Sequence, residues 1–175
     1  MAKKIRTGFF GGSFNPVHEA HLALGDHLIS RHLVDECWFV VSPQNPLKGT
    51  ADPADAGSRL KAVEKALESH PGCFASDIEF GLPLPSYTVQ TLRFATEHYP
   101  NREFILLIGG DNLDVFTKWK EYDYLLENFD ILVYPRPGAG NQVPKGCKRV
   151  KMLDGVMMDV SSTEIRKKYK SGFLK

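Results

Sequence analysis

The chain has 175 residues, of which 42% are hydrophobic and 25% are charged, and its formal net charge is +1. These values describe a soluble globular protein of single-domain size, and the near-neutral charge argues against a nucleic-acid partner. The three cysteines are far apart in sequence, which disfavours a disulfide framework or a zinc knuckle. Without a signal-peptide pattern or an apolar run of membrane-spanning length, we expect one cytoplasmic domain, residues 1–175, with no membrane association.

Strand-like and helix-like segments alternate along the chain. Apolar runs rich in branched and aromatic residues predict about five strands, with a possible short sixth, at residues 5–10, 37–41, 74–78, 104–108, 131–134 and 149–153. Helical spacing predicts helices at residues 17–32, 57–70, 87–98, 111–128 (in one or two pieces) and 161–170. The alternation predicts an α/β fold, a doubly wound parallel sheet whose ligands bind beyond the carboxyl ends of the strands.

The junction between the first strand and the first helix, residues 11–21, reads GGSFNPVHEAH. Glycines let the backbone approach a ligand, Pro16 can open a helix, and a helix start carries roughly half a positive charge. His18 and His21, three residues apart, can face the same anion. The spacing fits neither the dinucleotide nor the P-loop pattern and is one residue short of the H-E-x-x-H zinc motif. A plain strand–turn–helix with surface histidines is the alternative, and the combined features favour phosphate binding.

A second informative stretch, residues 161–166, reads SSTEIR. Ser161 and Glu164 fit a capping box, so this stretch can simply be the start of a helix. Three hydroxyl groups followed by Arg166 also suit a bound phosphate. Taken alone, the capping interpretation is preferred.

These stretches resemble the signatures of a known family. Residues 11–21 resemble the nucleotide-binding motif of the nucleotidylyltransferase superfamily, with Ala20 where that family often has Gly, and residues 161–166 resemble its closing S-S-T-x-[IV]-R motif. Residues 86–92 resemble the S-Y-T-x-D-T-L segment of nicotinate-mononucleotide adenylyltransferases, with Gln90 in place of Asp. Residues 109–112 with Trp119, the loop 43–48 and residues 136–138 resemble further motifs of that family.

The resemblance implies a Rossmann-like fold and adenylyl transfer from ATP to nicotinate mononucleotide, with Mg²⁺ held by the phosphates and no protein metal site. It implies catalytic roles for His18, His21, Lys48 and Arg166. The implied ATP contacts are Gly11, Gly12, Ser13, Phe14, Gly109, Asp111, Arg136, Ser161, Ser162 and Thr163. The implied contacts to the nicotinate nucleotide are Tyr87, Thr88 and Trp119.

Other interpretations stay open. Asp111 could merely cap a helix, Trp119 could be a core residue, and Lys48 could be solvated in its Pro-rich loop. Nicotinamide mononucleotide and phosphopantetheine are alternative acceptors on the same scaffold. A non-catalytic nucleotide sensor is the alternative from another class, although binding alone does not need two histidines, Lys48 and Arg166 together. The sequence leaves the oligomeric state undetermined.

Overall fold

The computed structural model describes residues 2–46, 53–156, 163–165 and 167. Its six strands form one parallel sheet in the order β3-β2-β1-β4-β5-β6. The strands are β1 (Ile5–Gly12), β2 (Glu36–Val41), β3 (Cys73–Ser76), β4 (Arg102–Gly109), β5 (Asp130–Tyr134) and β6 (Val150–Met152). The α-helices are α1 (Glu19–Ser30), α2 (Ala56–Leu67), α3 (Thr88–His98), α4 (Gly110–Asp114) and α5 (Tyr122–Asn128). Three 3₁₀ turns are η1 (Pro53–Asp55), η2 (Ile78–Gly81) and η3 (Phe116–Lys118).

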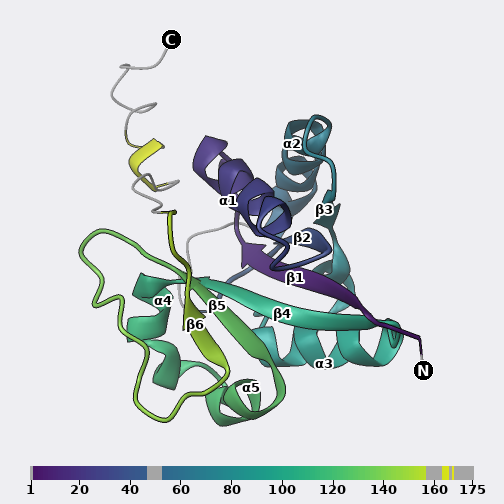
Figure 1. The fold of residues 1–175 in the computed structure, drawn as a ribbon. Helices are drawn as coiled ribbons and strands as arrows, with labels where there is room; N and C mark the ends of the chain where they lie inside the picture. The colour runs from purple at the N-terminus through teal and green to yellow at the C-terminus, as the bar shows by residue number, and fades with distance from the viewer. Residues whose placement is uncertain (1, 47–52, 157–162, 166, 168–175) are drawn as a thin grey trace.

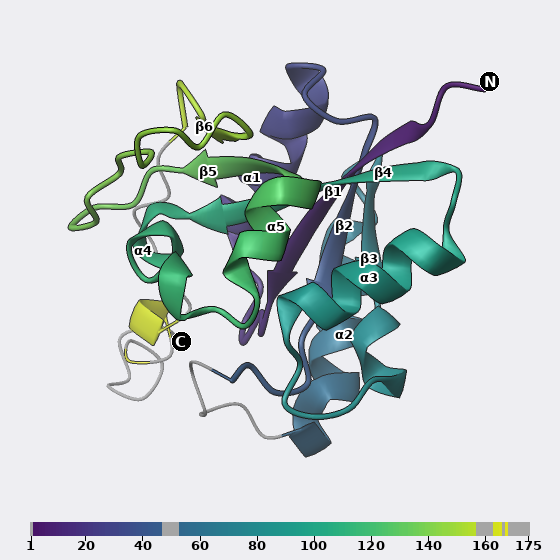
Figure 2. The same cartoon turned by 90° about the horizontal axis from the view of Figure 1, so that it is seen from below.

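Helices cover both faces of the sheet, α1 and α2 on one side and α3, α4 and α5 on the other (Figures 1 and 2). Side chains of β1 alternate between the two cores, because successive residues of a strand point to opposite faces. Phe10 packs with Leu24 of α1, and Phe9 packs with Leu92 of α3. The doubly wound α/β fold is therefore confirmed, and the possible short sixth strand at residues 149–153 is present as β6.

The sheet reverses its winding at β1, which pairs with β2 on one side and with β4 on the other. At such a switch point the connecting segments leave the sheet in opposite directions and open a crevice beyond the strand ends. Gly12 is the last residue of β1 and Gly109 the last residue of β4, so both strands end at this switch point. The fold thus brings two predicted glycine segments to one edge.

The first helix begins later than predicted. Gly11 and Gly12 belong to β1, because they pair with Val40 and Val41 of β2, and are not part of the connecting loop. Phe14 then adopts a left-handed backbone (φ 46°) and buries its ring, so the chain turns before helix geometry can start. Pro16 therefore does not open the helix, which starts at Glu19 with His18 as its N-cap.

Two other segments differ from the expectation. The third strand ends at Ser76, whose hydroxyl accepts a hydrogen bond from the Ile78 N–H and starts η2. The helix expected at residues 111–128 is divided into α4, η3 and α5. The last break includes Glu121, whose left-handed backbone (φ 51°) stops the helix from running through. This interruption leaves Trp119 half-buried outside a continuous helix, where it lines a pocket.

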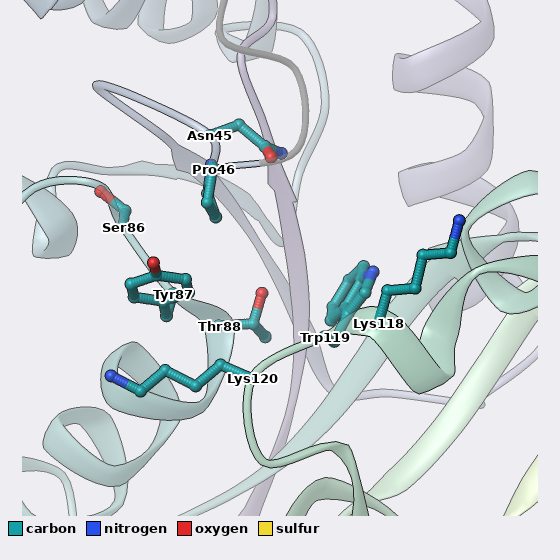
Figure 3. A pocket seen from close by; sticks show the side chains of 8 residues that line it. All are labelled: Asn45, Pro46, Ser86, Tyr87, Thr88, Lys118, Trp119 and Lys120. Atoms are coloured by element: carbon teal, nitrogen blue, oxygen red, sulfur yellow. The ribbon is translucent and has the colours of Figure 1, made fainter.

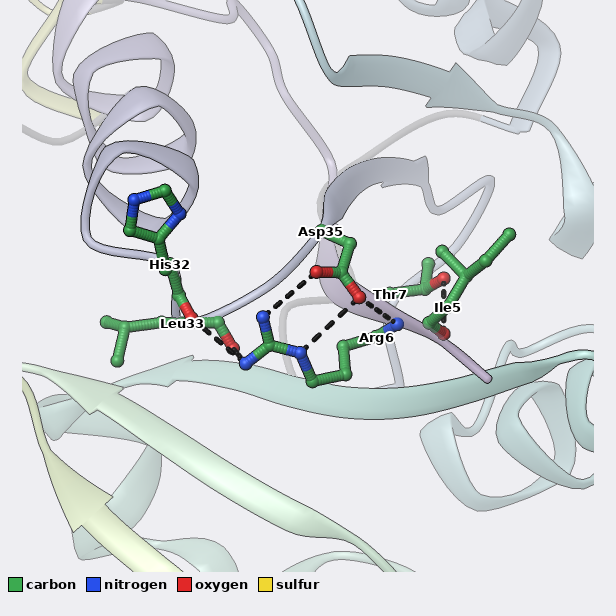
Figure 4. A network of polar contacts seen from close by, with 6 residues as sticks. All are labelled: Ile5, Arg6, Thr7, His32, Leu33 and Asp35. Atoms are coloured by element: carbon green, nitrogen blue, oxygen red, sulfur yellow. Dashed lines mark hydrogen bonds and ion pairs between the residues drawn. The ribbon is translucent and has the colours of Figure 1, made fainter. Parts of the chain in front are cut away.

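A polar network lies at the amino-terminal end of β1, opposite the switch-point glycines (Figure 4). Arg6 pairs with Asp35 at 2.9 Å and donates a second hydrogen bond to the His32 carbonyl at 2.9 Å. The Arg6 guanidinium lowers the pKa of Asp35. This network fixes the amino end of β1 far from the crevice.

Among the helices described, none is both long and apolar enough to traverse a bilayer.

Candidate functional site

The two motif histidines form a compact pair at the start of α1. Their rings stack with centroids 3.6 Å apart and planes 22° apart. The His18 backbone N–H donates to Nδ1 of His21 at 3.1 Å. Because Nδ1 of His21 accepts this bond, the proton of a neutral His21 ring lies on Nε2. His21 also packs edge-on against Phe14, at 5.1 Å between ring centroids, which fixes the ring orientation.

The pKa of His18 lies below that of an ordinary histidine. Burial lowers its pKa by penalising the charged imidazolium, and the nearby Arg136 guanidinium lowers it further. Both ring nitrogens of His18 are buried atoms without a hydrogen-bond partner in the described part of the chain. Such unsatisfied groups are rare and mark positions where a ligand can complete the bonding. His18 can therefore offer one N–H to a bound anion.

Arg136 lies at the end of β5 and faces the same region. Its Nε is 3.9 Å from Oδ1 of Asp111, which is exposed in the first turn of α4. The Asn141 side chain accepts from the Arg136 N–H at 3.0 Å and donates to its carbonyl at 2.8 Å. Gly140 donates to the Asp114 carboxylate at 2.9 Å. These bonds hold the start of the Pro/Gly-rich loop against α4 and place a guanidinium at the crevice.

The glycines at the end of β4 allow this close packing. A Cβ atom on Gly109 would collide with the Asp111 side chain and lie 3.0 Å from the Tyr134 ring. A Cβ atom on Gly110 would collide with the Asn141 side chain. The segment from β4 into α4 therefore has no room for side chains at these two positions.

A pocket opens beside the crevice (Figure 3). Its lining comes from the loop after β2, the start of α3 and the segment between η3 and α5: Asn45, Pro46, Ser86, Tyr87, Thr88, Lys118, Trp119 and Lys120. Trp119 and Tyr87 lie on opposite sides, with Thr88 between them (Figure 3). The indole of Trp119 is half-buried and packs on Phe116 with centroids 5.0 Å apart. The three residues expected to contact the acceptor thus share one pocket.

The electrostatics of this pocket favour an anion. Tyr87 is the N-cap of α3 and Thr88 its first residue, so the positive end of the helix dipole points at the pocket. Lys118 and Lys120 add two cations, and the Lys120 ammonium lies 4.6 Å from the centroid of the Tyr87 ring. A planar ring carrying a carboxylate matches this combination of aromatic walls and positive charge.

The remaining predicted residues are placed in part. Ser13 lies between β1 and Phe14, and its carbonyl accepts a hydrogen bond from Arg59. Thr163 is exposed in a short helical stretch, residues 163–165. Lys48, Ser161, Ser162 and Arg166 lie outside the described residues.

Two buried charged residues near the site were not foreseen from the sequence, Arg59 and Glu79. Arg59 lies on the same helical stripe as Val63 and Leu67, four residues apart each time, and all three are buried. A charge in an apolar stripe is the signal that could have identified Arg59. Glu79 sits in a 3₁₀ turn, where periodicity gives no such signal.

The strand order, the glycines at the switch point and the paired histidines define a doubly wound α/β protein with a candidate site at the switch point of its sheet. A family model described as cytidylyltransferase-like matches residues 9–168. A probable nicotinate-nucleotide adenylyltransferase of Cytophaga hutchinsonii is 42% identical over 162 residues, covering 93% of this chain and 84% of that protein. Its counterpart in Bacteroides fragilis is 44% identical over 169 residues, covering 97% and 84%.

Solved structures share the fold. A Plasmodium falciparum nicotinic acid mononucleotide adenylyltransferase complexed with NaAD gives a TM-score of 0.74 at 18% identity, over 93% of this chain and 83% of that one. A putative nicotinate-nucleotide adenylyltransferase of Vibrio parahaemolyticus gives 0.66 at 21% identity, over 96% and 88%. The chain belongs to the cytidylyltransferase-like family and, within it, to the nicotinate-nucleotide adenylyltransferases that its relatives represent.

Proposed function

We propose that this protein transfers the adenylyl group of ATP to nicotinate mononucleotide and releases pyrophosphate. The product is nicotinate adenine dinucleotide, in a cytoplasmic step of NAD biosynthesis. The observation that carries this proposal is an aromatic, positively charged pocket beside a switch-point crevice that holds a histidine pair. The names of relatives that are about 40% identical support the same reaction.

The acceptor nucleotide occupies the pocket of Figure 3 in this proposal. Its pyridine ring stacks on Trp119, and its carboxylate meets the N-terminus of α3 at Thr88. Lys118 and Lys120 add attraction for the carboxylate, which a nicotinamide lacks. We therefore expect nicotinate to be preferred.

The chemistry needs alignment more than acid–base catalysis. An oxygen of the acceptor 5′-phosphate forms a bond to the α-phosphorus of ATP, and the bond from that phosphorus to the bridging oxygen of the β-phosphate breaks. Pyrophosphate leaves with the electron pair. Because the nucleophile is already an anion, no general base is required, and the protein contributes orientation and positive charge.

The residues of the crevice supply that stabilisation. His18 and the Nε2–H of His21 donate to oxygens of the α-phosphate and of the departing pyrophosphate, and Arg136 adds a fixed charge near His18. Lys48 and Arg166 are proposed to add further cations, and the hydroxyls of Ser161, Ser162 and Thr163 to hold phosphate oxygens.

Magnesium fits this site as a companion of ATP. Asp111 is the one carboxylate among the proposed site residues, and in the described part of the chain no three His, Cys, Asp or Glu side chains gather to hold a metal. Such a donor set suits Mg²⁺ bound mainly by phosphate oxygens, which is usual for this ion. When bound, the ion neutralises part of the triphosphate charge.

The test is pyrophosphate release with ATP and Mg²⁺, using nicotinate mononucleotide, nicotinamide mononucleotide and phosphopantetheine as parallel acceptors. We expect rapid release with the first and little with the others. A preference for the nicotinamide nucleotide would contradict the role given to the α3 N-terminus and the lysines. Folded protein that binds ATP and is inactive with all three would contradict adenylyl transfer to these acceptors and favour a nucleotide sensor.

A further inference from the structure

Arg59 and Glu79 are the two buried charged side chains within the described ranges, with 5% and 4% of their surface exposed. Charged groups are seldom buried unless specific partners compensate for the lost water. Neither residue belongs to a motif that the proposed function uses. Their partners therefore indicate what they do.

Arg59 joins two segments that come from neighbouring strands. Its Nη1 donates to the carbonyls of Ser13 at 2.7 Å and Ser42 at 2.8 Å, and its Nη2 donates to the carbonyl of Pro43 at 3.1 Å. Ser13 follows β1 and leads to the histidine pair, whereas Ser42 and Pro43 follow β2. One guanidinium thus connects two loops. One is the loop between β1 and α1, residues 13–18, which we call the phosphate-side loop, and the other is the loop after β2, which forms a wall of the pocket.

Glu79 joins the same wall to α3. The Thr91 hydroxyl donates to its Oε1 at 2.9 Å, and Thr91 is fully buried. Burial raises the pKa of Glu79, and the hydroxyl groups of Thr91, Ser42 and Ser86 around the carboxylate partly offset this effect. The bond from Thr91 ties η2 to the start of α3 and places the Glu79 carboxylate beside the loop after β2 and beside Ser86.

The two buried charges meet at Ser42. Its carbonyl accepts from Arg59 at 2.8 Å, its N–H donates to the Gly12 carbonyl at 2.8 Å, and its hydroxyl is one of the groups that lower the pKa of Glu79. Two residues further, the Gln44 carbonyl accepts from the Ser86 N–H at 2.9 Å, and the chain then reaches Asn45 in the pocket lining. Residues 42–46, the described part of the loop after β2, belong to no strand or helix, so these bonds position them.

We propose that Arg59 and Glu79 are positioning residues that hold the loop after β2 against the start of α3 and so shape the acceptor pocket. The inference rests on the proposed function, because it assigns that pocket to the acceptor nucleotide. Glu79 acts on the pocket alone, whereas Arg59 acts on the pocket and on the phosphate-side loop through Ser13. The two residues therefore have different kinetic signatures.

The test compares KM values for the two substrates in variants of the full chain. Glu79→Ala should raise the acceptor KM about tenfold or more and leave the KM for ATP within about twofold, because hydrogen bonds to a charged group are lost on one side of the site. Thr91→Val removes one hydroxyl with little change in volume and should raise the acceptor KM about threefold to tenfold. Glu79→Gln, which keeps an oxygen acceptor for Thr91, should recover most of the loss.

Glu36→Ala is the matched control. Glu36 is also a shielded carboxylate that accepts from a threonine hydroxyl, Thr7 at 2.8 Å, and it pairs with Arg102 at 2.7 Å at the opposite edge of the sheet. This variant should lose thermal stability without a change in either KM. Arg59→Met should raise both KM values, and Arg59→Lys should restore them in part.

Two results would overturn the inference. One is Glu79→Ala and Thr91→Val variants that melt earlier but keep wild-type KM values, as expected of the Glu36→Ala control. The other is an equal rise in both KM values for Glu79→Ala and Thr91→Val. Inactivity of the wild-type protein with nicotinate mononucleotide is a separate result, because it contradicts the proposed function itself before any variant is compared.

Discussion

At the scale of single residues, the two histidines have different capacities. Nδ1 of His21 accepts a backbone N–H, so a neutral His21 ring has its proton on Nε2, whereas His18 has a lowered pKa and both ring nitrogens unpaired among the described residues. A rigid, correctly aimed N–H stabilises developing phosphate charge without reorganisation. The pair therefore acts through geometry, and its stacking makes each ring dependent on the other.

His21→Ala should lower turnover by about two orders of magnitude or more, the typical loss for one such donor. Steady-state pyrophosphate release measures the effect. His27→Ala, on the same helix but outside the site, serves as the control and should keep normal turnover. A His21→Ala variant with a near-normal rate would remove the histidine pair from the proposed mechanism.

The pKa of His18 should lie below that of an exposed histidine in the free protein and should rise when ATP binds. Burial and Arg136 disfavour the imidazolium, and a bound triphosphate reverses the sign of the local charge. Titration of the imidazole nitrogens by NMR, with and without a non-hydrolysable ATP analogue, measures both values. A His18 pKa in the free protein equal to or above that of exposed His32 would contradict this assignment.

Trp119→Ala should raise the KM for nicotinate mononucleotide about tenfold and leave the KM for ATP almost unchanged, because a base–aromatic stack contributes about 1–3 kcal/mol. The kinetic assay with each substrate varied in turn measures both constants. A Trp119→Phe variant, which retains an aromatic face, should lie between the two. A selective loss of ATP affinity in Trp119→Ala would show that the stacking role is wrong.

The residues of the candidate site that are local in sequence could be brought together by prediction, and their roles stay predictions. His18, His21, Tyr87, Thr88 and Trp119 lie in short recognisable stretches, and the structure gathers them at one edge of the sheet. The buried supports were not predictable, because their meaning depends on partners far along the chain. Arg59 reaches back 46 residues to Ser13, and no local pattern specifies that contact.

At the scale of secondary-structure elements, the alternation of strand-like and helix-like segments along the sequence correctly predicted five strands and the doubly wound arrangement. Element ends were less accurate, because tertiary pairing determines them. Gly11 and Gly12 are strand residues only because β2 offers partners to them. The helix expected at residues 111–128 is interrupted by the extended backbone of Trp119 and the left-handed backbone of Glu121, which helical periodicity does not indicate.

Gly25 lies where α1 packs closely on the sheet. A Cβ atom there would lie 2.9 Å from the Cys73 sulfur and 3.0 Å from the Phe39 ring. Gly25→Ala should therefore lower the free energy of unfolding by about 1 kcal/mol, since overpacking by about 1–3 kcal/mol outweighs the helix propensity of alanine. Urea unfolding measures this change.

Gly57→Ala is the matched control for this prediction. Gly57 is also helical, in α2, and a Cβ atom there would meet nothing within 4 Å. Alanine at this position should stabilise the protein by about 0.5–1 kcal/mol. Equal stability gains in the two variants would contradict close packing between α1 and the sheet.

At the scale of the whole molecule, the two ends of the strands differ in the charged groups that they carry. The carboxyl edge has the histidine pair, Arg136 and the pocket, whereas the amino edge has exposed ion pairs such as Arg6–Asp35. Exposed pairs contribute little to stability, with a median of about 0–1 kcal/mol. The buried charges at the carboxyl edge therefore affect the pH response of folding more than the surface pairs do.

Glu79 should make the protein less stable as the pH rises above about 4.5. Its pKa is higher in the folded state than its ordinary value of 4.5, so the folded state binds the proton more tightly. Its stabilising contribution is complete below the unfolded pKa and is lost as the pH rises through the folded pKa. Urea unfolding of the wild-type protein and of Glu79→Gln between pH 4 and about 8 measures this contribution as a difference.

The difference between these two proteins isolates Glu79. Asp35 and Glu121 have pKa values lowered by Arg6 and Arg93 and act in the opposite direction, but they are present in both proteins. The wild-type protein should lose stability relative to Glu79→Gln as the pH rises. A constant difference across the range would contradict a raised pKa for Glu79.

The break before α5 also gives the molecule an optical property. Trp119 is half-buried in the pocket. Trp38, on β2, is 9% exposed and packs against Tyr99 and Phe104. A pyridine ring stacked on Trp119 would quench one emission and leave the other unchanged. The fluorescence of the unlabelled protein then reports when the acceptor enters, and stopped-flow records with and without ATP reveal the order in which the two nucleotides arrive.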